Sequence, residues 1–403
     1  MKKVNLRAKL NREVYEVISE CMKVSEICGI KIYLVGGIVR DILLSKRLHD
    51  VDITVEGNAK EFVEILDCYV KTKFVKFNET LPTAKVVFQN GVEIDFASTR
   101  KEVYDNFGDL PKIVETGCPL NEDIKRRDFT VNSLVISLNR ENLFELIDLT
   151  GGLEDLRNKQ LRVLHKKSFL DDPSRMIRGL KFAQRLDFKL EKGTKKLQDE
   201  YIENPLKNIP LERVKNEVID LFSLNFASCF DEFVSQKLYK IFGVDFAEKI
   251  TGFDIKSALF DYEICDEDIW KLYFLPLFAK SDVPEKLNLT VREKKIVKNL
   301  HSIYKNRPIF EDNYSIFEYF SNKDYLFVVF YGIFIDGKIA KKFFKIKDTK
   351  IEITGFDLQK EGFEQGKIYS EIQKAVLKEK LNHGLCGKEQ ELIFVRENYK
   401  NQK

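Results

Sequence analysis

Hydrophobic and polar residues follow two different rhythms along this chain. Near the N-terminus, apolar positions recur at helical spacing over residues 12–28. A short apolar run at 32–35 then predicts a strand, and helical spacing returns over 38–44 after a Gly-Gly pair. The same criteria predict a helix over 59–66 and strands over 50–55, 69–77, 84–88 and 92–97.

The pattern changes after residue 100. Residues 100–125 carry few periodic apolar positions and predict an extended loop, a feature that is often functional in compact domains. We expect a helix to open at 126–134, and 144–156 predicts a strand, a Gly-Gly turn and a helix start that close a first domain. From about residue 190 the pattern is helical, most clearly over 212–224, 226–242, 291–305 and 368–380.

The composition narrows the class of protein. A length of 403 residues suggests two to four domains, and 44% hydrophobic residues are enough for ordinary cores. The net charge is only +3, so any contact with RNA must come from local patches. Seven scattered cysteines without a C-x-x-C pair predict a reduced, cytoplasmic protein and argue against structural zinc. Because no apolar run is long enough to span a bilayer, we expect no membrane association.

The first candidate chemistry follows the strand at 32–35. Gly36 and Gly37 let backbone N–H groups approach a ligand closely, the helix start after them favours an anion, and Arg40 can reach the same anion. Strand alternation then puts Asp50 and Asp52 on one face, where their repulsion is relieved by a hard divalent ion such as Mg²⁺. The bland alternative is an ordinary turn followed by an edge strand with solvated carboxylates.

Two more stretches carry polar residues that suit a nucleotide. In the strand at 92–97, Glu93 and Asp95 share one face, and a carboxylate on a neighbouring strand is what a two-metal site needs as a third ligand; the alternative is a residue that faces solvent. At the start of the next predicted helix, Arg126 and Arg127 suit a triphosphate, because arginine binds phosphate through a planar fork. Asp128 and Asn132, four residues apart, share a face and could bind ribose hydroxyls; a helix cap with a surface arginine pair is the alternative.

A third polar stretch begins a helix at Pro173. Asp172, Arg175 and Arg178 recur at i, i+3 and i+6, so they stay within one third of the helix circumference. Charges at this spacing are commonly an exposed ladder of ion pairs. The alternative is a polar surface that binds a ligand.

These motifs together resemble a known family. Val35-Gly-Gly-Ile-Val-Arg-Asp followed by Asp50-Val-Asp-Ile-Thr-Val-Glu-Gly57 is similar to the head signature of class II tRNA nucleotidyltransferases, the CCA-adding enzymes, which bacterial poly(A) polymerases share. Arg126-Arg-Asp-Phe-Thr-Val-Asn132 resembles the family's R-R-D-F-T-[IV]-N motif, and Asp171-Asp-Pro-Ser-Arg175 resembles its E-D-x-x-R motif. Asp171 departs from the usual Glu, and Lys181 stands where an Arg is common.

The resemblance implies an α+β fold. An N-terminal nucleotidyltransferase head, with a mixed β-sheet and helices as in the DNA polymerase β superfamily, would be followed by an all-α neck, body and tail. The expected domains are the catalytic head, the neck that selects the base, the helical body and the tRNA-binding tail, at 1–150, 151–215, 216–300 and 301–403.

The resemblance also implies roles for single residues. Asp50, Asp52 and Asp95 would be catalytic. Asp50 and Asp52 would hold Mg²⁺ at the centre of the active site. Asp172 and Arg175 would act as a protein template for the incoming base. The remaining nucleotide-binding residues would be Gly36, Gly37, Arg40, Arg126, Arg127, Asp128, Asn132, Arg178 and Lys181.

The implied reaction is transfer of a nucleoside monophosphate from CTP or ATP to the 3′ end of tRNA, with release of pyrophosphate. A poly(A) polymerase, an enzyme that adds only CC or only A, and a catalytically inactive RNA-binding protein are the alternatives, and the oligomeric state stays open. Lysines at 341, 342, 345, 347 and 350 are either a patch for the RNA backbone or a solvated helix face.

Overall fold

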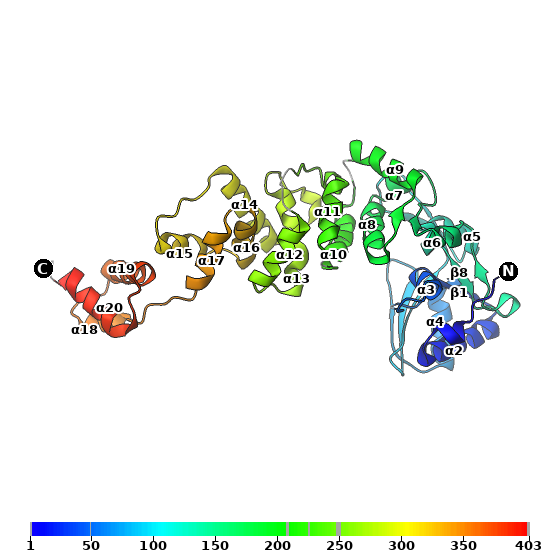
Figure 1. Cartoon of the computed structure of the whole chain (residues 1–403). Coiled ribbons are helices and arrows are strands. Elements are labelled where there is room, and N and C mark those ends of the chain that lie inside the picture. Colours follow the sequence, from blue (N-terminus) through cyan, green and yellow to red (C-terminus); the bar gives the residue numbers. More distant parts are fainter. Residues whose placement is uncertain (1, 49, 207–208, 225, 247–250, 401–403) are drawn as a thin grey trace. The chain divides into compact units, whose positions relative to one another are not determined.

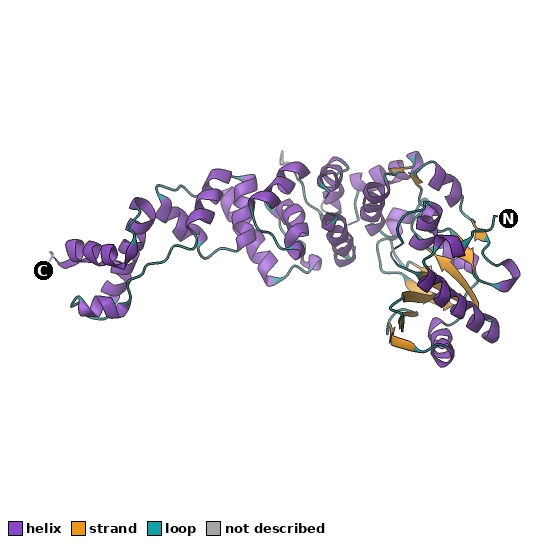
Figure 2. Cartoon of the chain, turned by 60° about the horizontal axis from the view of Figure 1, so that its bottom comes forward, coloured by secondary structure: helices purple, strands orange, loops and turns teal. Residues whose placement is uncertain are grey.

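A computed structural model describes residues 2–48, 50–206, 209–224, 226–246 and 251–400. The chain forms two compact units, each with its own core. The first comprises residues 1–221 and 232–243, and the second comprises 222–231 and 244–403. Strands belong to the first unit, and in the described part of the chain the last strand ends at Leu190 (Figure 2). The expected α+β architecture, a mixed sheet followed by a helical region, is confirmed.

The first unit is built on a seven-stranded sheet in the order β3-β4-β5-β2-β1-β8-β9. Strands β2 and β5 pair in parallel, whereas the other neighbours in this sheet are antiparallel, so the sheet is mixed. The strands are β1 (Lys31–Val35), β2 (Asp52–Glu56), β3 (Thr72–Phe77), β4 (Thr83–Phe88), β5 (Glu93–Ser98), β8 (Val135–Ser137) and β9 (Leu146–Ile147).

Two predicted helices cover one face of this sheet. Helix α2 (Arg12–Cys28) is capped by Asn11, and α4 (Ala59–Tyr69) packs beside it against the strands (Figure 1). Phe62 of α4 meets Phe96 of β5 with ring centroids 5.7 Å apart, and both side chains are fully buried. Since side chains alternate along a strand, the neighbours of these buried residues point to the opposite face.

The region 100–134 differs from the sequence prediction. The expected loop holds a hairpin of β6 (Arg100–Val103) and β7 (Lys112–Thr116), followed by α5 (Leu120–Lys125). The hairpin is largely exposed, so its strands need no apolar face and leave no hydrophobic pattern. The expected helix at 126–134 is also wrong: only the turn η1 (Thr130–Asn132) forms. Phe129 is extended because it bridges to Val163, a partner that local sequence does not reveal.

The rest of the first unit is mostly helical. Asp172 lies between α7 (Ser168–Asp171) and α8 (Ser174–Leu186), so it precedes the helix that carries Arg175 and Arg178. The short strands β10 (Gln160–Leu161) and β11 (Lys189–Leu190) pair in parallel. The remaining elements are α1 (Leu6–Lys9), α3 (Gly37–Leu43), η2 (Arg140–Asn142), α6 (Gly152–Arg157), α9 (Lys192–Glu203), α10 (Leu211–Ser223) and η3 (Leu238–Phe242).

The second unit is helical and has an aromatic core, in which Phe222 stacks on Tyr273 at 5.2 Å. The single helix expected at 226–242 is divided, because Lys237 takes a left-handed conformation between α11 and η3. The helices are α11 (Ala227–Ser235), α12 (Gly252–Asp261), α13 (Asp266–Phe274), η4 (Leu275–Phe278), η5 (Glu285–Leu287), α14 (Val291–Lys305), α15 (Asn313–Phe320), α16 (Tyr325–Phe334), α17 (Gly337–Ile346), α18 (Gly355–Lys360), α19 (Lys367–His383), α20 (Gly387–Val395) and η6 (Arg396–Lys400). None of the helices in the described ranges has the length and apolar character needed to cross a membrane.

Candidate active site

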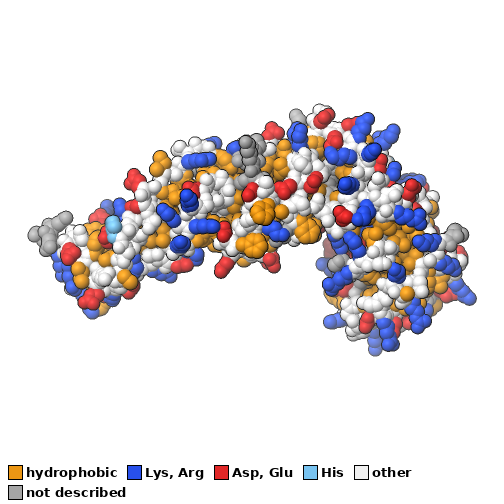
Figure 3. Space-filling model, viewed as in Figure 1, with side chains coloured by type: hydrophobic (Ala, Val, Ile, Leu, Met, Phe, Trp, Pro, Cys, Tyr) orange, Lys and Arg blue, Asp and Glu red, His pale blue; other side chains and the backbone are white. Residues whose placement is uncertain are grey.

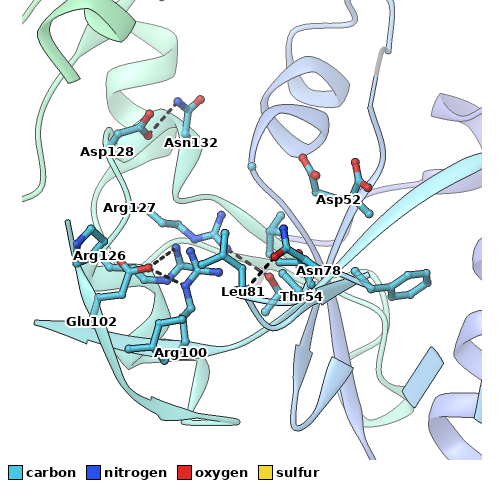
Figure 4. A pocket seen from close by; sticks show the side chains of 18 of the residues that line it. Asp52, Thr54, Asn78, Leu81, Arg100, Glu102, Arg126, Arg127, Asp128 and Asn132 are labelled. Carbon is cyan, nitrogen blue, oxygen red and sulfur yellow. Dashed lines mark hydrogen bonds and ion pairs between the residues drawn. The ribbon is translucent and has the colours of Figure 1, made fainter. Parts of the chain in front are cut away.

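A cavity of about 1200 Å³ lies in the first unit, over the face of the sheet opposite α4. Its wall combines strand residues of the head with residues of α8 and α10. Figure 4 shows Arg127 reaching toward Thr54 of β2, with Asp128 and Asn132 further along the wall. The predicted residues that line it are Gly36, Gly37, Arg40, Asp52, Asp95, Arg126, Arg127, Asp128, Asn132, Asp172, Arg175 and Arg178.

Two carboxylates face the cavity from adjacent strands. Asp52 on β2 is the register partner of Asp95 on β5, so both side chains point to the same face of the sheet. Burial, together with the charges of Asp95 and Asp50, raises the pKa of the Asp52 carboxyl to about 6. Burial also raises the pKa of Asp95, although the Lys85 ammonium opposes this effect. Their mutual repulsion is what a bound cation would relieve, and carboxylate oxygens are the ligands that Mg²⁺ prefers.

Asp50 occupies a different position. It is exposed just before β2 and does not line the cavity. Across the ranges that the structure describes, no group of three or more acidic, His or Cys side chains is arranged to hold a metal ion. The structure therefore brings Asp52 and Asp95 together, whereas Asp50 lies outside the cavity lining but close enough for its charge to raise the pKa of both.

The Gly-Gly turn lies beside Asp52. Gly36 has φ 74°, a conformation that favours glycine, and a Cβ there would lie 3.5 Å from Asp52 Oδ2. The same Cβ would lie 3.9 Å from Arg127 Nη1. The turn therefore approaches both a carboxylate and a guanidinium, which is the environment that a metal-bound phosphate requires.

The two adjacent arginines are held by a carboxylate that the sequence analysis missed. Asp123 of α5 is fully buried; its Oδ1 accepts from Arg126 Nη2 at 2.7 Å and its Oδ2 from Arg127 Nη2 at 2.9 Å. Burial acts to raise the pKa of Asp123, but the two guanidinium groups outweigh it and hold the pKa below its usual range. Asp123 lies three and four residues before the two arginines, a spacing at which helical side chains are neighbours. A predicted helix at the position of α5 would therefore have identified it.

A buried polar network joins α3 and the segment 128–132 to α8. Arg40 Nη1 donates to Asn132 Oδ1 at 2.7 Å, and Asn132 Nδ2 donates to Asp128 Oδ1 at 3.1 Å. Asp128 Oδ2 accepts from Arg178 Nη2 at 2.6 Å. Burial acts to raise the pKa of Asp128, but the Arg178 charge outweighs it and lowers the pKa. Because each of these side chains is hydrogen-bonded to the next, the network fixes the position of Arg178.

The predicted base-reading pair is surrounded by contacts from three elements. Arg175 Nη1 donates to Ser168 Oγ at 2.6 Å, and its Nη2 donates to the Arg126 carbonyl at 2.8 Å. Asp172 is 6% exposed, and its Oδ2 lies 2.6 Å from Arg213 Nη2. Arg213, from the first turn of α10, lines the cavity and was not identified from the sequence, because no local pattern pairs it with Asp172.

Some predicted polar residues lie elsewhere. Lys181 does not line the cavity; its ammonium lies 2.7 Å from Glu217 Oε2 and 2.9 Å from Asp220 Oδ2. Among the C-terminal lysines, Lys341 pairs with Asp261 at 2.9 Å. Figure 3 shows basic and acidic side chains interspersed on the face that it presents. The surface charge is thus mixed, as the small net charge predicts.

Residues 32–162 match the Poly A polymerase head domain family. The A-adding tRNA nucleotidyltransferase of Aquifex aeolicus is 43% identical over 190 residues, which are 47% of this chain and 23% of that protein. The CCA-adding enzyme of Staphylococcus epidermidis is 27% identical over 311 residues, covering 76% of this chain and 73% of that enzyme. A solved apo structure of a CCA-adding enzyme superposes with a TM-score of 0.82 at 25% identity, covering 98% of both chains.

The match to the A-adding relatives is confined to part of their length. The chain spans less than half of each of three such proteins, with shares of 23%, 21% and 44%. The likeness to the solved CCA-adding enzyme extends over nearly the whole of both chains. Residues 32–162 are therefore similar to the poly A polymerase head family, and the chain as a whole has the fold of a CCA-adding enzyme.

Proposed function

We propose that this chain, whose residues 32–162 match the Poly A polymerase head domain family, is a tRNA nucleotidyltransferase that adds C, A or both to the 3′ end of tRNA. The observation that carries the proposal is the placement of Asp52 and Asp95 side by side in a cavity that also holds Arg126, Arg127 and Asp172. The relatives named A-adding and CCA-adding enzymes support it.

The reaction is a nucleotidyl transfer. The oxygen of the RNA 3′-hydroxyl forms a bond to the α-phosphorus of CTP or ATP and loses its proton, while the bond from that phosphorus to the bridging oxygen breaks and pyrophosphate leaves. Members of this family generally use divalent metal ions. We assign Mg²⁺ to Asp52 and Asp95, with the charge of Asp50 nearby; when bound, it would activate the hydroxyl and stabilise the leaving group.

The triphosphate is assigned to the side of Asp52 where the glycine turn lies. Gly36 allows close approach of the backbone, and Arg127 contacts Thr54 of β2 while facing that turn. The ion pairs with Asp123 order the side chains of Arg126 and Arg127 before phosphate binds. Little side-chain entropy is therefore lost on binding. Arg40, Asn132, Asp128 and Arg178 act as positioning residues through their network.

Base selection is assigned to Asp172 and Arg175. Cytosine and adenine each present an amino group beside a ring-nitrogen acceptor, so a carboxylate that accepts and a guanidinium that donates suit both. Uracil presents a carbonyl and an N–H at those positions. Each mismatch leaves a buried polar group unpaired, at a cost of roughly 1–3 kcal/mol.

The domains are assigned from the resemblance to CCA-adding enzymes. Residues 1–150 form the catalytic head, 151–215 the neck, 216–300 the body and 301–403 the tRNA-binding tail. A tRNA-processing role places the protein in the cytoplasm, in agreement with its scattered free cysteines. A chain that adds only A is the second candidate, because the relatives of 43%, 39% and 35% identity are named A-adding.

One experiment separates these functions. The protein is incubated with three tRNAs that lack CCA, CA or only the terminal A, with CTP and ATP supplied separately. A full CCA-adding enzyme extends all three substrates; an A-adding enzyme extends only the tRNA that ends in CC. A poly(A) polymerase adds many A residues to each, and a protein that extends none overturns the proposal.

A further inference from the structure

Four charged side chains form one row across the open face of the sheet. In register, Lys76 of β3 faces Lys85 of β4, Lys85 faces Asp95 of β5, and Asp95 faces Asp52 of β2. Directly opposed residues of paired strands point to the same face. All four line the cavity, so the row runs from two cations at the sheet edge to the two carboxylates of the candidate active site.

Each half of this row contains like charges directly opposite each other, an arrangement that is destabilising by itself. The acidic half suits a cation, and by the same argument the basic half suits an anion. Lys76 makes no ion pair in the part of the chain that the structure describes. The Lys85 ammonium lies 3.0 Å from Glu93 Oε2, but these side chains are 47% and 58% exposed, so the pair is weak and replaceable.

An exposed aromatic side chain completes this surface. Phe74 lies two residues before Lys76 on β3, on the same face, and is 52% exposed. Val86 and Phe88 of β4 point to the opposite face of the sheet, toward α4, and are buried. An exposed ring beside cations is the combination that proteins use to bind single-stranded nucleic acid, through base stacking and phosphate contacts.

We propose that Phe74, Lys76 and Lys85 bind the last nucleotides of the RNA strand whose 3′-hydroxyl is extended. This inference rests on the proposed function. Strands lie about 5 Å apart, so Lys85 and Lys76 are about 5 Å and about 10 Å from Asp95 across the sheet. An RNA end whose hydroxyl lies at the carboxylates then runs over the two lysines, with its last phosphates facing their ammonium groups and a base on Phe74.

The position of the arginines argues against the incoming triphosphate as the occupant. In the sheet order, the lysines lie on the β4 side of Asp95, whereas Gly36 follows β1 and Arg127 contacts β2. The two anion-binding surfaces thus flank the carboxylates from opposite sides. Nucleotidyl transfer needs such a division, because the attacking 3′-oxygen and the leaving pyrophosphate must lie in line on opposite sides of the α-phosphorus.

The test uses the full chain with the double variant Lys76→Ala/Lys85→Ala. We expect kcat/KM for tRNA, at saturating nucleotide, to fall about tenfold, and the slope of log affinity against log salt to fall by about 1.4 for the two contacts. The KM for CTP and ATP should stay within about twofold of the parent's, since the triphosphate lies elsewhere. Lys23→Ala is the matched control: Lys23 is an exposed lysine of α2, on the other face of the sheet, and its loss should change none of these values.

Single variants at Glu93 and Phe74 should change tRNA binding in opposite directions. Glu93→Gln frees Lys85 and removes a carboxylate that repels RNA, so the KM for tRNA should fall. Phe74→Ala should weaken tRNA binding about fivefold or more, and Phe74→Trp should restore it, because stacking depends on an aromatic ring. Equal effects of Phe74→Ala and Phe74→Trp would overturn the stacking role.

A modified substrate locates the contact. A neutral methylphosphonate replaces the last phosphodiester of the tRNA. It should lower kcat/KM for the parent but cause little further loss in Lys85→Ala, because the contact is already missing. If the methylphosphonate lowers kcat/KM in Lys85→Ala by the same factor as in the parent, the assignment of this phosphate to Lys85 is overturned.

Failure of this inference is distinguishable from failure of the proposed function. An active parent whose double variant loses nucleotide affinity but keeps tRNA affinity overturns the RNA site and identifies the lysines as triphosphate ligands. Unchanged values for both substrates also overturn it. A parent that incorporates no nucleotide, but whose tRNA affinity by fluorescence anisotropy falls in the double variant, overturns the proposed function and supports the RNA site. A parent with no tRNA affinity overturns both.

Discussion

Arg213 of α10 holds the carboxylate of Asp172 through an ion pair of 2.6 Å between Nη2 and Oδ2. Asp172 is buried, and its Oδ1 is occupied by the backbone N–H and hydroxyl of Ser174. Arg175 Nε lies 3.8 Å from the same carboxylate. The group assigned to base selection is therefore oriented by a residue 41 positions later in the chain (213 minus 172).

Replacement of Asp172 tests the base assignment. Asp172→Ala should lower the use of CTP and ATP and relax discrimination against UTP, because the acceptor for the amino group is lost. Incorporation of each of the four nucleotides at saturating tRNA is the measurement. Arg185→Ala, on an exposed part of the same helix, is the control. If Asp172→Ala keeps the parent's ratio of CTP to UTP use, the charges at 172–178 are structural ion pairs only.

Removal of Arg213 should act on the same property by another route. Arg213→Ala leaves the buried Asp172 carboxylate without its nearest cation, which should cost about 1–3 kcal/mol of unfolding free energy. The KM for CTP and ATP should rise more than kcat falls, since positioning of the base is affected and the carboxylates are not. Arg213→Lys should recover part of both losses. A variant with parental stability and parental KM values would show that the ion pair has no role in selection.

Asp52 carries the metal assignment. Asp52→Asn should abolish incorporation while the melting temperature of the metal-free protein stays the same or rises, because a half-buried carboxylate that repels Asp95 is removed. Calorimetry checks the fold and an incorporation assay with Mg²⁺ checks the activity. Near-normal incorporation by the folded variant would refute the assignment. Asp348→Asn is the control for the effect of an Asp→Asn change as such, because Asp348 is an exposed residue of the second unit.

Acid should destabilise the protein partly through Asp128. The folded-state pKa of Asp128 is lowered: burial opposes this, and the Arg178 charge outweighs burial. A lowered pKa contributes stability at pH values above the unfolded pKa of about 3.9, and this contribution disappears as pH falls through the folded pKa. Urea unfolding at several pH values from 7 to 3 should therefore show a smaller loss for Asp128→Asn than for the parent. Parallel curves for the two proteins would contradict this prediction.

The two units predict a division of labour. A fragment of residues 1–243 keeps η3, which packs on α9 and is held by the contact between Gln198 and Gln236 at 2.7 Å. It should bind CTP and ATP as the full chain does, but it should lose tRNA affinity about tenfold or more, because the helical unit contributes phosphate contacts. Equilibrium binding at matched salt is the measurement. Tight tRNA binding by the fragment would place the whole RNA surface in the first unit.

Local patterns in the sequence determined the elements and the faces of the catalytic strands. Periodicity identified α2, β1, β2, β4 and β5 with their approximate limits, because a core-facing strand or helix must repeat its apolar residues at a fixed period. The same alternation put Asp52 and Asp95 on the open sides of their strands. The polar hairpin β6–β7 escaped prediction because exposed strands bury little and leave no such pattern.

Only the tertiary structure decided which charges meet. The parallel register of β2 and β5 places Asp52 beside Asp95, and the register of β3, β4 and β5 aligns Lys76, Lys85 and Asp95. Helix spacing predicted that Asp172 would share a helix face with its arginines, but Asp172 precedes α8 and pairs with Arg213. Such pairings depend on how distant elements pack, and the energy of an ion pair depends on burial that the assembled fold supplies. Sequence alone thus determines the groups that can react, and packing determines which of them stand together.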